Sequence, residues 1–129
     1  MQLDHVAFDI CERDVVPFYL ELLQGKMIRS FQLSQVDAGF LFQIDKPTTV
    51  YLVDYGSFMI ELFVSDCSKN GSFHHLCLQV EKADELAALA KEKGYAVNDR
   101  KGKNGITYFL YDSNHNIVEI KTKRNDEKK

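Results

Sequence analysis

The sequence predicts an α+β fold built from two tandem βαβββ modules, because strand-like segments recur along the chain in the same order. Residues 3–10 recur as residues 73–80, which relates His5 to His75 by a shift of 70 positions. The stretch from 49 to 62 recurs as 107 to 120, which relates Glu61 to Glu119 by a shift of 58. An internal repeat of this kind indicates one supersecondary unit used twice. Segregated helices and strands in each copy favour a mixed α+β architecture with helices over one face of the sheets.

The first module begins with a strand, because residues 3–10 alternate between an apolar face and a face that carries His5. Asp14 is a candidate helix N-cap, and apolar residues at helical spacing then run to Gly25. Residues 26–33 are strand-like. Residues 34–47 are less regular, and we expect a loop or a lid that carries Phe40, Leu41 and Phe42. A hairpin of residues 48–54 and 58–64 completes the module.

The second module follows a polar, turn-forming link over residues 65–72. It repeats the order of the first, with one helix after its first strand. We expect strands at 76–80, 95–98, 105–112 and 117–122, and a helix at 84–93 that ends at Gly94. Module 1 therefore covers about residues 1–66 and module 2 about 72–123 of a single domain. The basic segment from 124 to 129 is expected to be a frayed tail.

The bulk composition excludes several classes of protein. The chain has 129 residues, of which 45% are apolar and 27% charged, as is usual for one globular domain. A formal net charge of −3 argues against a nucleic-acid partner. No apolar run reaches the roughly 18–20 residues of a membrane span, and strand-like sequence directly after Met1 predicts no signal peptide. Three irregularly spaced cysteines suit a reducing cytoplasm better than a disulfide framework, and we expect them to behave as small hydrophobes.

Two histidines and two glutamates occupy equivalent positions in the two modules, and they are the candidate ligands of a divalent metal: His5, Glu61, His75 and Glu119. An ionised glutamate is rarely buried unless it is paired or bound to metal. Imidazole and carboxylate donors suit Ni²⁺, Co²⁺, Zn²⁺, Mn²⁺ or Fe²⁺.

A purely structural interpretation competes with the metal site. A single strand histidine is more often hydrogen-bonded than metal-bound, and each glutamate could lie on the wet face of an edge strand. That alternative is stronger for Glu119, which shares its strand face with Lys121. His74 points away from the face of His75 or lies at the strand entry, and His115 is expected to be an exposed turn residue. Cys77 lies on the candidate site face.

The duplicated module resembles the vicinal oxygen chelate superfamily, whose fold is a pair of curved mixed sheets. The resemblance is carried by the segment from Leu3 to Ala7, by Pro17-Phe18-Tyr19 with Leu22-Leu23, and by the segment from Tyr111 to Ile120. It covers essentially residues 1–123 and makes the chain a single glyoxalase-like domain. The four candidate ligands match the His/Glu/His/Glu set of bacterial glyoxalase I (lactoylglutathione lyase) proteins.

This resemblance implies a metal-dependent lyase or isomerase that acts on the hemithioacetal of a 2-oxoaldehyde through an enediolate. Ni²⁺ or Co²⁺ is the preferred cofactor and Zn²⁺ a further candidate; Glu119 is the expected base, with Glu61 as ligand and second base. Methylmalonyl-CoA epimerases use similar enolate chemistry. A metal-free drug-binding module of the bleomycin-resistance type is a further alternative. Dioxygenases and fosfomycin-resistance enzymes typically use two histidines and one glutamate, which leaves Glu61 without a role.

Two expectations remain about details of the chain. An extra residue separates Leu23 from Gly25, where the family usually has Leu-Gly directly, so the helix end should differ. Arg13, Arg29 and Arg100 are candidates by residue type for holding a thiol substrate such as glutathione. Exposed strand edges predict a homodimer, and relatives pair their modules either within one chain or between two.

Overall fold

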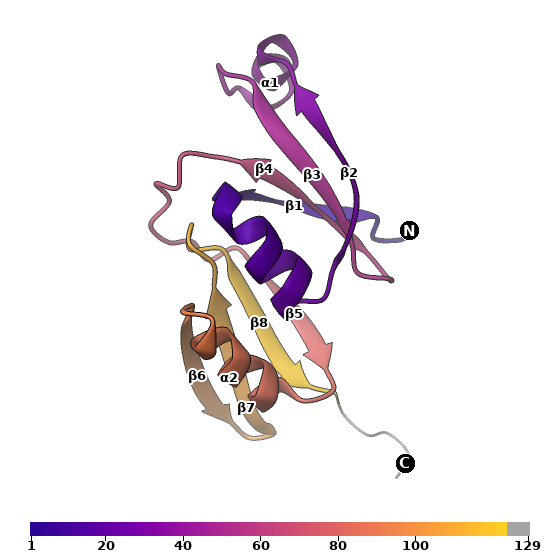
Figure 1. Cartoon of the computed structure of the whole chain (residues 1–129). Coiled ribbons are helices and arrows are strands. Elements are labelled where there is room, and N and C mark those ends of the chain that lie inside the picture. The colour runs from indigo at the N-terminus through magenta and orange to yellow at the C-terminus, as the bar shows by residue number, and fades with distance from the viewer. Residues whose placement is uncertain (124–129) are drawn as a thin grey trace. The chain divides into compact units, whose positions relative to one another are not determined.

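The computed structural model describes residues 1–123 in two compact units, and the expected tail at 124–129 lies outside the described residues. Unit 1 comprises Met1–Ser68 and unit 2 begins at Lys69, and each contains one four-stranded sheet (Figure 1). The α+β class with two repeated modules is confirmed. No helix among the described residues has the length and apolarity that are needed to cross a bilayer.

Unit 1 is a mixed sheet in which the first and last strands of the module lie side by side. Its strand order is β1-β4-β3-β2, and β1 pairs in parallel with β4 while the other pairs are antiparallel. The bounds are β1 His5–Ile10, β2 Lys26–Leu33, β3 Thr48–Asp54 and β4 Met59–Val64. The core of the unit lies on one face of this sheet, and its largest fully buried side chains there are Ile10, Phe18, Tyr19, Leu22, Ile60 and Leu62.

The helical segment after β1 is a π-helix over most of its length, where the sequence predicted an α-helix. A short 3-10 turn, η1 (Glu12–Asp14), leads into a π-helix, η2 (Val15–Leu22), which is the indigo coil of Figure 1. The Leu23 amide donates to the Phe18 carbonyl five residues earlier, and Gln24 then has a φ of 60°. A π-helix takes up an additional residue per turn, so this geometry accommodates the extra residue before Gly25.

Gly25 is required by close packing at the end of η2. A Cβ on Gly25 would collide with the Val53 side chain and would lie 2.7 Å from both the Tyr19 carbonyl oxygen and the Tyr55 ring. The Tyr55 hydroxyl also donates to the Tyr19 carbonyl at 2.7 Å. The junction therefore has no room for a side chain at position 25. Its close packing and the Tyr55 hydrogen bond hold η2 against the sheet that carries the site residues.

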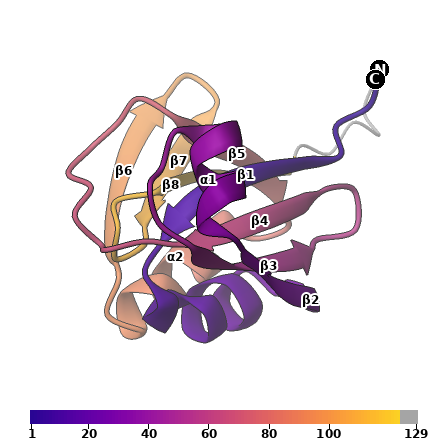
Figure 2. The same ribbon diagram turned by 90° about the horizontal axis from the view of Figure 1, so that it is seen from above.

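The expectation of a loop or lid over residues 34–47 was wrong for its first part, which forms the helix α1 (Gln35–Phe42). The Ser34 side chain caps this helix by accepting from the Asp37 amide at 3.1 Å, and Gln43 ends it in the left-handed conformation. A Ser followed three residues later by an acidic residue is a helix-start signal that the irregular hydrophobic pattern had hidden. Figure 2 shows α1 in front of the strands of unit 1.

Unit 2 repeats the topology of unit 1, with strand order β5-β8-β7-β6 and a parallel β5–β8 pair. Its helix α2 (Ala83–Glu92) packs on β6, β7 and β8, and its apolar face includes the fully buried Ala83 and Ala90. Strand β6 is longer than expected because it extends to Gly102. The bounds are β5 His75–Val80, β6 Ala96–Gly102, β7 Gly105–Tyr111 and β8 Ile117–Thr122.

A buried polar turn joins β7 to β8. The Asp112 carboxylate accepts from the backbone amides of Asn114 and Asn116 at 2.9 and 2.8 Å and from the Asn116 side-chain amide at 2.9 Å. The oxygens of Asn114 and Asn116 in turn accept from the amide and the ammonium of Lys69. Buried polar groups stabilise a fold only when they are paired, so this turn fixes the start of β8 and anchors the first residue of unit 2.

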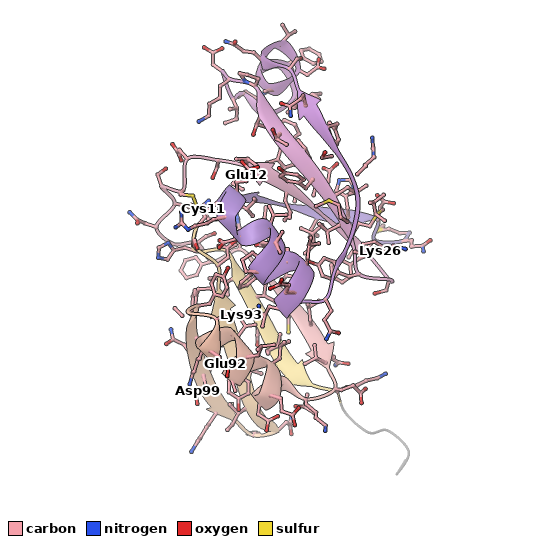
Figure 3. The ribbon with its side chains drawn as sticks, viewed as in Figure 1. Cys11, Glu12, Lys26, Glu92, Lys93 and Asp99 are labelled. Carbon is pink, nitrogen blue, oxygen red and sulfur yellow. A yellow bond between two sulfur atoms is a disulfide. The ribbon has the colours of Figure 1, made fainter. Side chains whose placement is uncertain are left out.

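Cys11 and Cys67 form a disulfide in unit 1, which differs from the expectation that all three cysteines act as small hydrophobes (Figure 3). Their Cα atoms lie 5.2 Å apart although 56 positions separate them in the sequence, a distance within the usual range for a disulfide. The irregular spacing in the sequence concealed the pair because only the parallel β1–β4 pairing brings the two segments together. Cys77 is a free, exposed cysteine.

We expect protein purified without reductant to contain one titratable thiol after unfolding, and three after reduction. Replacing Cys67 with Ser should lower the free energy of unfolding by about 2–4 kcal/mol, because the crosslink restricts a long loop in the unfolded chain. Urea titrations with and without dithiothreitol measure this change. A Cys77→Ser control should lose stability on reduction as the wild type does. Three thiols in the non-reduced, unfolded protein would contradict the disulfide.

Candidate metal centre

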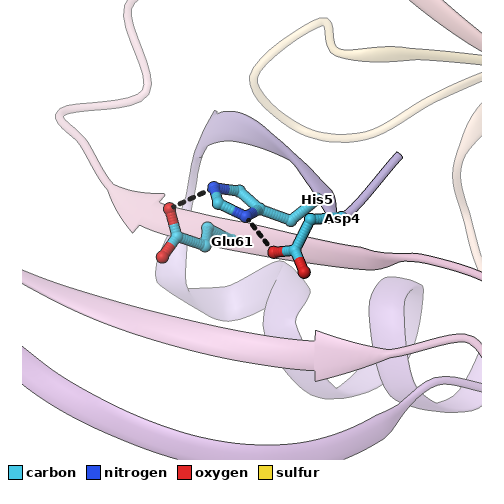
Figure 4. A network of polar contacts seen from close by, with 3 residues as sticks. All are labelled: Asp4, His5 and Glu61. Atoms are coloured by element: carbon cyan, nitrogen blue, oxygen red, sulfur yellow. Dashed lines mark hydrogen bonds and ion pairs between the residues drawn. The ribbon is translucent and has the colours of Figure 1, made fainter. Parts of the chain in front are cut away.

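In unit 1, His5 and Glu61 come together from neighbouring parallel strands. Glu61 on β4 is the register partner of Ala7 on β1, so His5, two residues earlier on the same face, reaches the carboxylate diagonally. Figure 4 shows the His5 ring between the Glu61 and Asp4 carboxylates. The His5 Nε2 lies 3.2 Å from the Glu61 Oε1. The His5 Nδ1 lies 2.8 Å from the Asp4 carboxylate. Asp4, His5 and Glu61 therefore form one polar chain.

Unit 2 contains the same arrangement. Glu119 on β8 is the register partner of Cys77 on β5, and His75 lies two residues before Cys77. The His75 Nε2 lies 3.2 Å from the Glu119 Oε1, the same separation as in unit 1. The His75 Nδ1 donates to the Phe73 carbonyl at 3.0 Å. The sequence repeat that relates His5 to His75 and Glu61 to Glu119 therefore also holds for the positions of their side chains within each unit.

The hydrogen bonds at Nδ1 determine what each Nε2 can do. An imidazole that donates from Nδ1 to an oxygen acceptor and remains neutral presents an Nε2 lone pair. The Nε2 atom faces a carboxylate oxygen in both units. Two electron-rich atoms at this distance are favourable only if a positive charge lies with them, which is either a second proton on the ring or a cation that binds both. Metal-ligating histidines are usually oriented by such Nδ1 hydrogen bonds.

The glutamates do not lie on edge strands. β4 and β8 each pair on both sides, and the side chains of Glu61 and Glu119 are only 21% and 16% exposed. The edge-strand interpretation is therefore wrong for both residues, including Glu119, for which the sequence favoured it more. A largely enclosed carboxylate needs a compensating positive charge, and the histidine atom that each carboxylate meets is the Nε2 described above.

The pKa of His5 is raised above its ordinary value of 6.5. The principal cause is the hydrogen bond to the Asp4 carboxylate; burial lowers the pKa by a smaller amount, and the negative charge of Glu61 raises it again. Asp4 is a residue that the sequence analysis did not single out. A carboxylate immediately before a strand histidine was the available signal, and unit 2 has no carboxylate at the equivalent position, where His74 stands.

The remaining candidates lie outside the two His–Glu pairs, although Cys77 is next to Glu119 on the neighbouring strand and Arg100 lines a cavity with Glu119. The His115 Nδ1 donates to the Lys69 carbonyl at 2.8 Å in the turn before β8, which confirms the prediction that it is an exposed turn residue. His74 precedes β5, with its backbone amide bonded to the Ser72 hydroxyl. Burial, and then the charge of Glu119, raise the pKa of the Cys77 thiol, which disfavours a thiolate. The Arg29 guanidinium lies over the Phe31 ring.

A cavity of about 470 Å³ in unit 1 adjoins the His5–Glu61 pair. Asp9 and Phe63, each two residues further along its strand than Ala7 and Glu61, line it together with Phe42 from α1. The rings of Phe42 and Phe63 meet edge to face with their centroids 5.4 Å apart. The residues expected to form a lid therefore divide, because Phe42 faces the cavity while Phe40 is 79% exposed. A cavity of this size accommodates a small molecule.

Within either unit, no three histidine, cysteine or acidic side chains of the described residues lie together in a way that would hold a metal ion. Each unit contributes one nitrogen and one oxygen donor. The structure brings His5 to Glu61 and His75 to Glu119; the union of the two pairs in one four-ligand site stays a prediction.

No family model and no curated protein matches the sequence, but solved structures resemble the fold closely. A fosfomycin resistance protein, FosX, from Listeria monocytogenes is 14% identical with a TM-score of 0.72, and the match covers 98% of this chain and 94% of that one. A glyoxalase family protein from Enterococcus faecalis is 18% identical with a TM-score of 0.67, covering 93% and 94%. FosX from Mesorhizobium loti is 16% identical with a TM-score of 0.65, covering 98% and 94%. The chain thus has the vicinal oxygen chelate fold.

Replacing Asp4 with Asn should lower the pKa of His5 toward 6.5, because the variant loses the carboxylate that stabilises the protonated ring. Below its pKa the ring carries a proton on Nε2, so the wild-type Nε2 becomes available to a cation only at a higher pH than in the variant. NMR titration of the His5 ring protons in metal-free protein measures the shift. The control Asp37→Asn removes a charge that does not act on His5. Equal His5 titrations in wild type and Asp4→Asn would contradict this assignment.

Proposed function

We propose that the two His–Glu pairs bind one divalent metal ion, and that the protein is a metal-dependent enzyme that moves a proton next to a substrate carbonyl. The activity that we propose is that of a glyoxalase I-like lyase or isomerase, which acts on the hemithioacetal of a 2-oxoaldehyde. The observation that carries the proposal is the matched geometry of the pairs, each with an Nε2···Oε1 separation of 3.2 Å and an anchored Nδ1.

The donor set fits a borderline divalent ion. Two imidazole nitrogens and two carboxylate oxygens, without a thiolate, suit Ni²⁺ or Co²⁺ and also Zn²⁺. Support for a divalent ion also comes from the Listeria FosX, of which a mutant was solved in complex with Mn(II) and 1S,2S-dihydroxypropylphosphonic acid. When bound, such an ion would act as a Lewis acid toward neighbouring oxygens of the substrate.

Glu119 is the residue that we assign as the base. It lines a cavity of about 670 Å³ in unit 2, whereas Glu61 does not line the unit 1 cavity, so a substrate carbon has access to the Glu119 carboxylate. His75 orients that carboxylate through its Nε2 contact. Glu119 would accept the proton from the carbon beside the carbonyl and return it to the neighbouring carbon, while Glu61 would remain a ligand.

Two narrower alternatives follow from the same fold. Epimerisation next to a thioester, as in methylmalonyl-CoA epimerases, would begin with the same proton removal by Glu119, but the carbon that lost the proton would then receive one from the opposite face, with Glu61 as the acid. A metal-free drug-binding module would use the apolar cavity under α1 and would leave the His–Glu pairs without a role. We favour the enzyme because the pairs recur in both units at one distance.

The assembly that we favour is a homodimer with a small-molecule substrate. The edge strands β1 and β2 of unit 1 have no second partner strand among the described residues, and neither do β5 and β6 of unit 2. Covering such edges is a common reason for association. A shared metal site can be completed by two units of one chain or by units of two chains. A monomer in sedimentation with full metal occupancy would rule out a site between two chains, whereas activity restored on mixing His5→Ala with His75→Ala protein would support it. A cytoplasmic location is part of the proposal, and the Cys11–Cys67 disulfide counts against it, since persistent disulfides are rare there. Alkylation of free thiols in intact cells before lysis tests it: a cytoplasmic protein should show all three cysteines reduced.

Replacing His75 with Ala should remove most of the bound metal, because the site loses one of four donors and leaves Glu119 without its partner. His5→Ala should have the same effect. The matched control is His74→Ala, the adjacent histidine, which should retain wild-type metal content. Elemental analysis after loading with Ni²⁺, Co²⁺, Zn²⁺ or Mn²⁺ and dialysis measures the outcome. Undiminished metal content in both His5→Ala and His75→Ala would overturn the shared site.

Glu119→Gln should reduce kcat by about 10²–10⁴-fold while metal content falls much less, because an amide oxygen can still coordinate but cannot accept the proton. Turnover of a methylglyoxal–thiol hemithioacetal, and exchange of the α-proton of an acyl-CoA with deuterium, are the assays. The same substitution at Glu61 should cost less in kcat. Equal losses in the two variants would contradict the assignment of Glu119 as base.

A further inference from the structure

The internal repeat produces two cavities in equivalent places, one in each unit. Each lies on the sheet face of the His–Glu pair. The cavity in unit 1 begins beyond the pair along the strands, whereas Glu119 of the pair itself lines the cavity in unit 2. The strand register relates β3 to β7 by a shift of 57 positions, one less than the sequence comparison gave, because Leu52 pairs with Glu61 and Phe109 with Glu119. Four pairs of equivalent positions line both cavities: Asp9 and Gln79, Thr48 and Gly105, Phe63 and Lys121, and Val64 and Thr122. The two cavities can therefore be compared position by position, and any difference in their chemistry arises from divergence of the copies.

The cavities have opposite character. In unit 1 the lining includes four large apolar side chains and two acids beside a single lysine: Leu33, Phe42, Ile44 and Phe63, then Asp9 and Asp66, then Lys46. In unit 2 the cavity of about 670 Å³ is lined by four cations, Arg100, Lys101, Lys103 and Lys121, and Glu119 is the one acid among its lining residues. The replacement of Phe63 by Lys121 at equivalent positions places a positive charge two residues from the candidate base.

The cations converge because of the β6–β7 hairpin. Gly102 and Gly105 are register partners on either side of a two-residue turn that holds Lys103. Arg100 and Lys101 precede the turn on β6, and Lys121 comes from β8 on the far side of β7. None of the four forms an ion pair with another residue in the part of the chain that the structure describes. No acid of the described residues therefore contacts these cations directly, although the chain as a whole is acidic.

We propose that this cavity is a binding site for a doubly charged oxyanion of the substrate, a phosphate or phosphonate group, held by Arg100, Lys103 and Lys121 beside Glu119. Several cations around one pocket attract a dianion more strongly than a carboxylate, because the interaction energy scales with the product of charges. Arginine and lysine donors also match the tetrahedral arrangement of phosphate oxygens. As a statement about the substrate this rests on the proposed function; as a statement about anion binding it stands without a metal.

The binding experiment uses metal-stripped, dialysed protein, with inorganic phosphate as the probe. Isothermal titration and ³¹P line broadening should show saturable binding in the wild type, and acetate at equal ionic strength should bind more weakly. Lys103→Gln and Lys121→Gln should each raise the Kd for phosphate about tenfold, the loss expected when one charged hydrogen bond is removed. Lys103→Arg should retain binding. The matched control is Lys91→Gln, which removes the same charge from α2, outside the cavity lining.

The results separate this inference from the proposed function. Two separate measurements are compared: phosphate binding by metal-stripped protein, and metal content after loading. Phosphate binding that depends on Lys103 and Lys121, together with a failure to retain any offered metal, would support the anion site and overturn the metal centre. Metal binding through His75, with no saturable phosphate binding, would do the reverse. Equal losses in Lys91→Gln and Lys103→Gln would overturn the site because they indicate a general charge effect, and acetate binding as tight as phosphate would overturn the preference for a dianion. If Lys121→Gln fails to fold, Lys103→Gln on the exposed turn still decides the question.

Discussion

The parallel pairing between the first and last strands of each unit is the constraint on which the candidate chemistry depends. It sets Ala7 opposite Glu61 and Cys77 opposite Glu119, so that a histidine two residues earlier reaches the carboxylate diagonally. Side chains alternate between the faces of a strand, and a slip of one residue would send the histidine to the helix-covered face. The parallel pairing in turn requires a long crossover, which η2, α1 and the intervening strands supply in unit 1.

Duplication and divergence have acted on different layers of this frame. The positions that face the helices stay apolar in both units, with Ile60 and Leu62 in one matched by Val118 and Ile120 in the other, all fully buried. The opposite face keeps the His–Glu pair but differs beside it, where Cys77 replaces Ala7, Gln79 replaces Asp9 and Lys121 replaces Phe63. A core tolerates little change in volume, whereas a residue that lines a cavity can change from phenylalanine to lysine. The two units therefore differ in the residues that line their cavities, and these residues determine which ligands each cavity can bind.

The strands and the equivalence of the candidate ligands could be predicted well, because both leave a direct signal in the sequence. Strands 26–33 and 48–54 and the faces of β1 and β5 follow from the alternation of neighbouring residues, and the pairing of the candidate ligands follows from the internal repeat. Three features were not accessible in this way. α1 has a weak apolar pattern and begins from a cap, η2 depends on how one extra residue is packed at Gly25, and the Cys11–Cys67 disulfide joins segments that meet only through a parallel strand pair. Tertiary packing decides such features.

The same disulfide sets how much slack the chain has between its two units. Cys67 is tied to Cys11 at the end of unit 1, and Lys69 is held by Asn114 and Asn116 at the start of unit 2, which leaves Ser68 as the one residue between two anchors. The Cα atoms of Cys67 and Lys69 are two residues apart and can be separated by at most about 7 Å in a fully extended chain. With the crosslink reduced, the nearest anchor in unit 1 becomes Ser65, whose amide and hydroxyl both donate to the Ile10 carbonyl. Reduction of the disulfide thus lengthens the unanchored segment between the two units from Ser68 alone to residues 66–68, and it leaves the hydrogen bonds of both sheets unchanged.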